Sequence, residues 1–116
     1  MQLSFKTPLW FYTVPVDFRK QLDGLSILVA DQLSMNPATG ELFIFRSKRA
    51  NKIKLLWYET NGFWLCYKRL DEGVFKFPNQ IDGSLELTRE QLGWLLSGLN
   101  LMEHKKIKTV KATKFF

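Results

Sequence analysis

The stretch "ELFIFRSKRANKIKLLWYETNGFWLCYKRL" (residues 41–70) contains three apolar runs separated by polar segments. The runs cover residues 41–45, 53–59 and 62–70, and they are rich in aromatic and branched side chains that favour strands. The dipeptide Asn61-Gly62, between the last two runs, is a strong local signal for a β-hairpin. The stretch therefore predicts an antiparallel β-meander of three strands.

Side chains alternate between the two faces of a strand, so pairing of the second and third predicted strands gives two sets of residues. One face carries Lys54, Leu56, Tyr58, Phe63, Leu65, Tyr67 and Arg69. The other face carries Ile53, Leu55, Trp57, Trp64, Cys66, Lys68 and Leu70. Both sets are mainly apolar, so either the sheet is covered on both sides or one face is kept for a partner. The sequence leaves these alternatives open.

Residues 8–33 predict a strand followed by a helix. "PLWFYTVPV" (8–16) is aromatic and β-branched, and the strand should end before Pro15. Asp17 stands where an N-cap belongs, and "DFRKQLDGLSILVADQL" (17–33) has apolar residues on one helical face. These apolar residues are Phe18, Leu22, Leu25, Val29 and Leu33. Gly24 costs about 1 kcal/mol relative to alanine in a helix, which indicates close packing against another element.

The last part of the chain predicts a short strand, a turn and a second helix. Residues 73–78, "GVFKFP", are typical of an edge strand stopped by Pro78, and residues 79–84 are typical of a turn. Thr88 and Gln91 form a capping box, and Gly98 can end the helix. The buried stripe of this helix is Leu92, Leu95, Leu96 and Leu99.

Together these elements predict an α+β fold: a mainly antiparallel β-meander sheet with an N-terminal helix packed on it and a C-terminal helix. A chain of 116 residues is long enough for one domain with its own core. We expect this domain to cover residues 1–102, followed by a basic tail at residues 103–116.

The composition predicts a soluble cytoplasmic protein. Cys66 is the single cysteine, so no internal disulfide can form, which suits a reducing compartment. The N-terminal residues lack the pattern of a signal peptide, and no apolar run reaches about 18 residues. We therefore expect no membrane partner.

Positive charge is concentrated in residues 45–54, "FRSKRANKIK". The chain has a net charge of +6, which favours nucleic acid or another polyanion as a partner. This segment holds five cations and no acid, and their mutual repulsion weakens the fold slightly unless an anion lies against them. The five are Arg46, Lys48, Arg49, Lys52 and Lys54.

Lys68 and Arg69 return toward the same end of an antiparallel meander and would complete a patch of seven cations that contacts phosphates. The alternative is a solvated hairpin whose lysines protect a loop or an edge from aggregation. A second candidate site is the pair Arg19 and Lys20 in the first turn of the predicted helix, where phosphate could bind. Here the alternative is local neutralisation by the neighbouring acids Asp17 and Asp23.

The sequence gives little support for an enzyme. His104 is the only histidine and lies beside a lysine-rich segment, while Cys66 has no histidine near it in sequence. One cysteine and one histidine cannot form a structural zinc site, and no phosphate-binding glycine motif or nucleophile-elbow motif occurs. We expect no catalytic residue, metal, cofactor or small-molecule substrate.

Three segments occur in an order that resembles a known family: "VDFRKQLDGLSILV", "NPATGELFIFRSKRANKIKLLWYETNGFWLCYKRLDEGVFKFP" and "LTREQLGWLLSGL". The chain is similar over roughly residues 8–100 to the second-open-reading-frame accessory proteins, labelled TnpB, of the insertion-sequence family numbered sixty-six. One departure is Trp57-Tyr58, where that family usually has two tryptophans. Its signature positions correspond to Asp17, Arg19, Lys20, Asp23, Gly24, Arg46, Arg49, Lys52, Lys54, Trp57, Lys68 and Arg69.

The resemblance implies a small protein that assists transposition beside a separate, larger transposase. We therefore expect a non-enzymatic accessory protein that contacts DNA through its basic hairpin and helix start, with DNA and the transposase as partners. An adaptor that docks the transposase through an apolar sheet face is the alternative. A metal-dependent nuclease that uses Asp17 is a third class.

Overall fold

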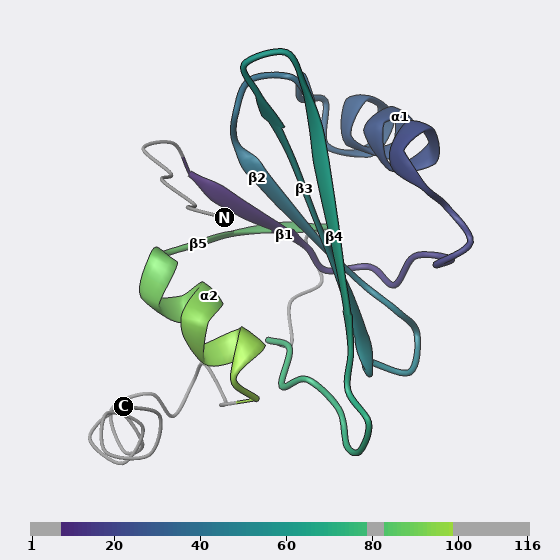
Figure 1. Ribbon diagram of the computed structural model, residues 1–116, viewed down its shortest axis with the longest axis vertical. Helices are drawn as coiled ribbons and strands as arrows, with labels where there is room; N and C mark the ends of the chain where they lie inside the picture. Colours follow the sequence, from purple (N-terminus) through teal and green to yellow (C-terminus); the bar gives the residue numbers. More distant parts are fainter. Residues whose placement is uncertain (1–7, 79–82, 99–116) are drawn as a thin grey trace.

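The computed structural model describes residues 8–78 and 83–98 as a five-stranded sheet with one helix on each face (Figure 1). The strand order is β4-β3-β2-β1-β5. The strands are β1 Leu9–Tyr12, β2 Leu42–Arg46, β3 Lys52–Glu59, β4 Gly62–Arg69 and β5 Ser84–Leu87. The helices are α1 Leu22–Gln32 and α2 Arg89–Leu96. The predicted α+β fold is confirmed.

The predicted meander of β2, β3 and β4 is confirmed, with β3 antiparallel to both neighbours. Glu59 pairs with Gly62, so the hairpin loop is the two residues Thr60 and Asn61. β1 joins the far side of β2 in parallel, and α1 forms the crossover between them. β5 then pairs antiparallel with β1 and ends the sheet.

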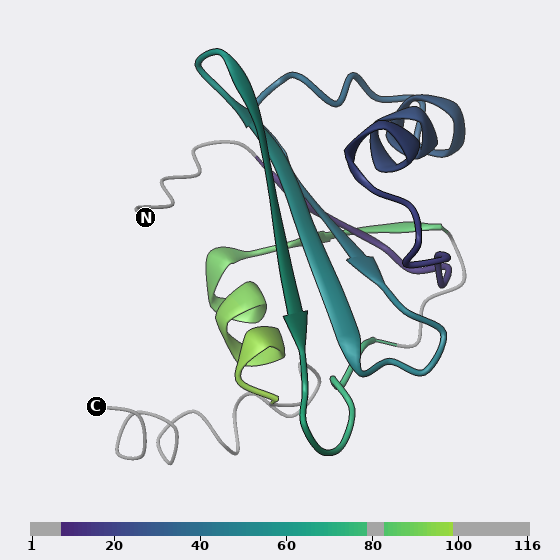
Figure 2. The same cartoon turned by 45° about the vertical axis from the view of Figure 1, so that its right-hand side comes forward.

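The two helices cover opposite faces of the sheet (Figure 2). Of the two alternatives left open by the sequence, the sheet is therefore covered on both sides, and neither face is kept for a partner. Leu25 and Val29 of α1 pack with Phe43, Phe45 and Leu56. Leu92 and Leu95 of α2 belong to a second cluster on the other face, whose sheet residues include Ile44, Leu55 and Trp57. The sheet therefore lies between two apolar layers.

The first helix begins later than predicted, at Leu22 and not at Asp17. The side chain of Asp17 accepts a hydrogen bond from the backbone N–H of Arg19, and its carbonyl accepts one from Lys20, so these residues form a separate turn. Gln21 is the N-cap and makes no side-chain capping bond. The predicted close approach at Gly24 is to Lys20: a Cβ at Gly24 would lie 3.3 Å from the Lys20 Cβ, not against another element.

Near the C-terminus, the strand prediction was wrong in position. Residues 74–78 form no strand; Phe75 is instead buried, and its N–H donates to the carbonyl of Ala50. The strand that the sequence did not predict is β5, a four-residue segment beside β1. The capping box of α2 is confirmed. Most of the predicted turn at residues 79–84, the stripe residue Leu99, and the boundary at residue 102 with the basic tail lie outside the described residues.

No helix in the described part of the chain is both long enough and apolar enough to span a membrane.

Candidate functional site

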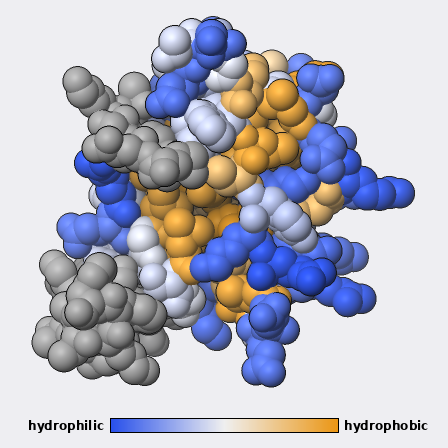
Figure 3. All heavy atoms as spheres, viewed as in Figure 1, coloured by the Kyte–Doolittle hydropathy of each residue, from blue (hydrophilic) through white to orange (hydrophobic). Residues whose placement is uncertain are grey.

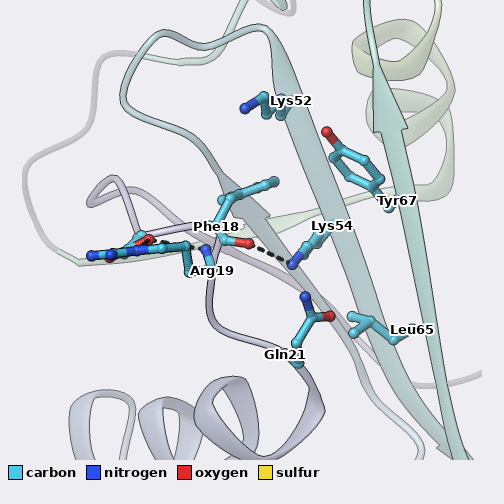
Figure 4. Close-up of a pocket in the computed structure, with 8 residues that line it drawn as sticks. Phe18, Arg19, Gln21, Lys52, Lys54, Leu65 and Tyr67 are labelled. Carbon is cyan, nitrogen blue, oxygen red and sulfur yellow. Dashed lines mark hydrogen bonds and ion pairs between the residues drawn. The ribbon is translucent and has the colours of Figure 1, made fainter.

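A pocket of about 430 Å³ opens between β3 and the turn that leads into α1 (Figure 4). Both sequence regions singled out for their charge reach it, since Arg19 comes from the turn and Lys52 and Lys54 come from β3. The lining residues are Asp17, Phe18, Arg19, Gln21, Lys52, Lys54, Leu65 and Tyr67. The fold therefore unites two groups of cations that lie far apart in the chain.

Lys54 is the most deeply buried cation of the pocket, with 4% of its surface exposed. Its Nζ donates hydrogen bonds to the carbonyl oxygens of Phe18 and Lys20, at 3.0 and 2.8 Å. It also lies 5.0 Å from the ring centroid of Phe18 and 5.8 Å from that of Tyr67, within the range of cation–π attraction. Burial, and then the charge of Lys52, lowers the pKa of Lys54.

No carboxylate within the described residues contacts Lys54. Two carbonyl dipoles and two ring faces therefore take the place of water around its ammonium group. An ammonium group carries three N–H donors, and two of them are used by these carbonyls. A positive charge therefore remains in the wall of the pocket without an anionic partner among the residues that the structure describes.

Arg19 is paired with Asp17 inside the turn. Its Nη2 lies 2.7 Å from Asp17 Oδ2, and its Nε donates to both carboxylate oxygens at 3.1 and 3.0 Å. These hydrogen bonds lower the pKa of Asp17 to about 2. Figure 4 shows the Arg19 side chain extending away from Lys54. Local neutralisation by Asp17 therefore accounts for Arg19, and both Arg19 and the exposed Lys20 precede the helix instead of lying in its first turn.

Four cations, one of them the pocket residue Lys52, lie at the end of the sheet where β2 and β4 finish and β3 begins. We call them the tip cations: Lys48, Arg49, Lys52 and Arg69. Lys48 and Arg49 are exposed in the turn after β2. Lys52 and Arg69 are directly opposite each other in the β3–β4 ladder, with Lys54 opposite Tyr67 one step further. Within residues 8–78 and 83–98, no acidic side chain pairs with a tip cation.

Arg46 and Lys68 lie on the other face of the sheet, each beside Ile53 in the ladder. Arg46 Nε donates to the carbonyl of Thr13 at 3.0 Å, and its guanidinium lies 5.6 Å from the ring centroid of Phe77. Lys68 Nζ donates to the carbonyl of Leu96 at 2.9 Å, at the last residue of α2. A cation suits a helix C-terminus because the last carbonyls there have no helical partner. The seven cations of the predicted patch therefore do not share one face.

Two aromatic residues of the pocket, Phe18 and Tyr67, were not predicted as site residues. Their ring centroids are 6.2 Å apart, and Tyr67 is 55% exposed although it belongs to the sheet face that packs against α1. The alternation pattern already placed Tyr67 on the same face as Lys54 and Arg69. An aromatic residue among cations on one strand face is the signal in the sequence that could have revealed Tyr67 as a site residue.

In the described part of the chain, no three histidine, cysteine, aspartate or glutamate side chains gather where they could hold a metal ion. Cys66 is half-buried and packs against the cluster under α2. His104 lies outside the described residues.

Comparison with known proteins gives one family. The family described as IS66 Orf2 like protein matches residues 7–106. The chain is similar to two proteins of Sinorhizobium fredii, "Uncharacterized protein y4jC" and "Uncharacterized protein y4hO". It is 35% identical to the first over 88% of this chain and 87% of the relative, and 35% identical to the second over 79% and 80%. No solved structure matches.

Proposed function

The chain belongs to the IS66 Orf2-like family, an accessory family of insertion sequences, and from this membership we propose that it assists transposition by contacting DNA through the tip cations. The observation that carries the proposal is the set of Lys48, Arg49, Lys52 and Arg69 at one end of the sheet, with no acidic partner in the described part of the chain. Clustered cations bind phosphate and release counterions from DNA. The transposase of the same element is the expected second partner.

The proposed contact is narrower than the predicted set of nine site residues. Arg46 and Lys68 hold backbone carbonyls on the α2 side, Lys54 is buried, and Arg19 is paired with Asp17. Each of these four side chains already has a contact within the protein or a buried position, which competes with phosphate binding. Lys20 is exposed and lies beside the pocket, where it can add to the attraction without setting the geometry.

A titration of duplex DNA at several salt concentrations tests the proposal. If all four tip cations meet phosphates, the slope of log K against log salt should be about −3 to −4. Arg49→Gln should make the slope less steep by about one. Arg89→Gln is the matched control, because Arg89 is also exposed but follows β5 at the opposite end of the sheet. A slope near zero, or equal effects of the two substitutions, would contradict DNA contact at this surface.

We also propose that the chain catalyses no step of transposition. Both oxygens of Asp17, the acid that lines the pocket among the described residues, accept hydrogen bonds from Arg19, which favours a structural role over metal binding. Supercoiled DNA incubated with the protein and magnesium should therefore stay uncut. Cleavage that is lost in Asp17→Ala would overturn this part of the proposal.

An adaptor that docks the transposase is the second candidate, and the outer edge of β4 favours it. Both sheet faces are covered by helices, but within the described residues no strand pairs with this edge. Trp64 and Tyr67 of β4 are about half exposed, and apolar surface flanks the strand (Figure 3). Transposase capture that survives nuclease treatment, moderate salt and substitution of the tip cations would favour the adaptor.

A further inference from the structure

The exposed ring of Tyr67 stands in a setting that differs from that of the other aromatic residues on this side of the sheet. Phe43 and Phe45 are fully buried under α1, whereas Tyr67 keeps more than half of its surface in solvent. The Phe18 ring is tilted against it with the centroids 6.2 Å apart, and the buried ammonium group of Lys54 lies over one face of the ring. The ring is therefore fixed in place but open to a ligand on one side.

Positive charge surrounds this ring. Lys54 lies opposite Tyr67 in the ladder, and Lys52 and Arg69 form the next pair on the same face. Arg69 is two residues from Tyr67 on the same strand, and Lys52 is its diagonal neighbour on the paired strand. Diagonal neighbours are about 7–8 Å apart, which long side chains can span, so both cations are within reach of a group bound beside the ring. Among the described residues that line the pocket, Asp17 is the one acid, and both of its oxygens accept hydrogen bonds from Arg19. An anion in this pocket meets a surplus of positive charge.

An exposed aromatic face beside a cation pair matches the chemistry of a nucleotide. A base stacks on the ring, and the phosphodiester next to it lies against the cations. Bases inside a duplex are already stacked on each other and present no free face to a ring on the protein surface. The arrangement therefore selects unpaired nucleotides and not duplex DNA.

We propose that the pocket binds one nucleotide of single-stranded DNA, with its base stacked on Tyr67 and its phosphate held by Lys52 and Arg69. This inference rests on the proposed function, because it assigns a strand preference to part of the same DNA-contacting surface. In this arrangement Lys48 and Arg49 contact duplex DNA, and the pocket binds a nucleotide of an unpaired strand next to the duplex.

Fluorescence anisotropy with the full chain tests the inference using a labelled single strand of about twelve nucleotides, within the usual site size of such proteins. The second ligand is the same strand with abasic positions, which keeps every phosphate and removes the bases. We expect at least tenfold weaker binding of the abasic strand, because stacking of one base is commonly worth that much. Equal affinity for the two strands would overturn the proposal without any change to the protein.

Substitutions locate the effect. Tyr67→Leu should weaken binding of the intact single strand about tenfold and leave the abasic strand and the duplex unchanged, while Tyr67→Phe should bind like the parent. Trp64→Leu is the matched control, because Trp64 is a half-exposed aromatic residue on the same strand but on the opposite face. An equal loss from Trp64→Leu, or no loss from Tyr67→Leu, would contradict stacking on Tyr67.

Binding of duplex DNA distinguishes a failure of the proposed function from a failure of the nucleotide pocket. If duplex DNA binds with the expected salt slope but intact and abasic strands bind alike, the proposed function stands and the nucleotide pocket is wrong. If neither duplex nor single strand binds at low salt, both proposals fail.

Discussion

Lys54 determines where α1 begins. In a helix that started at Asp17, the carbonyl of Phe18 would accept the N–H of Leu22, four residues later. Lys54 Nζ occupies this carbonyl and that of Lys20 instead, so helical bonding starts only with the N–H of Leu25 and the carbonyl of Gln21. A buried cation from another strand thereby overrides the local helical pattern.

The Asp17–Arg19 pair gives a prediction on pH dependence. The folded pKa of Asp17, about 2, is below its ordinary value of 3.8, so the folded state favours the ionised form. The stabilisation from this contact should be complete above pH 3.8 and lost as the pH falls through about 2. NMR titration of the carboxyl carbons should show Asp17 titrating near pH 2.

Arg19→Ala provides the control for this titration. Without its main hydrogen-bond donor, the Asp17 pKa should rise toward 3.8. An Asp17 pKa that stays near 2 in Arg19→Ala would assign the shift to another source.

The sequence located the pocket in part. Alternation placed Lys54, Tyr67 and Arg69 on one face, and the register confirms it. Charge alone could not separate a cation that binds backbone carbonyls, such as Lys54 or Lys68, from one that remains free. That distinction depends on carbonyls of Phe18 and Leu96, which the fold brings in from distant parts of the chain.

Among the elements, the β3–β4 hairpin has a strained loop. Thr60 has φ of 57°, in the left-handed region that a β-branched residue rarely adopts, while Asn61 does not have a positive φ. Thr60→Gly should relieve this strain and raise the free energy of unfolding by about 1 kcal/mol. Urea denaturation followed by tryptophan fluorescence measures the change.

Asn61→Gly is the matched substitution in the same loop. Because Asn61 lacks a positive φ, glycine there relieves no strain and only adds freedom to the unfolded chain. It should not stabilise the protein. A gain from Asn61→Gly equal to that from Thr60→Gly would mean that the loop has another conformation.

The elements predicted correctly are those with local signals. The meander follows from alternation and a two-residue hairpin, and α2 follows from a capping box in which Thr88 and Gln91 bond each other's backbones. The segment 84–87 has only four residues, and its strand conformation depends on pairing with β1 at the other end of the chain. Residues 74–78 have the composition of a strand, but Phe75 turns inward and its N–H is taken by Ala50.

At the scale of the whole molecule, several cations fasten the layers together. Lys54 joins β3 to the turn before α1, Lys68 joins β4 to the end of α2, and Arg46 joins β2 to the residue after β1. Each bond runs from a charged donor to a backbone carbonyl, a stronger bond than one between neutral groups. Some cations of this protein thus stabilise the fold through backbone carbonyls, while the tip cations remain for the proposed contact with DNA.

Phe75 closes the layer under α2, although it lies outside any helix or strand. It is 2% exposed and its ring lies 5.7 Å from that of Phe77. Phe75→Ala should lower the free energy of unfolding by about 3–5 kcal/mol, because it removes a buried ring and leaves a cavity. Urea denaturation provides the measurement.

Val74→Ala is the neighbouring control, since Val74 is 44% exposed. Its effect should stay within about 0.5 kcal/mol. Similar losses from the two substitutions would show that the segment is held by its backbone and not by the Phe75 ring.

The place of β1 in the sheet has a consequence for synthesis on the ribosome. β1 is made first, but its two neighbours come from residues 42–46 and 84–87, so one side of it stays open until nearly the whole described chain has been translated. The nascent meander can form early, whereas the layer beneath α2 must wait for the last strand and helix. The complete sheet can therefore form only after residues 84–87, which pair with β1, have been translated.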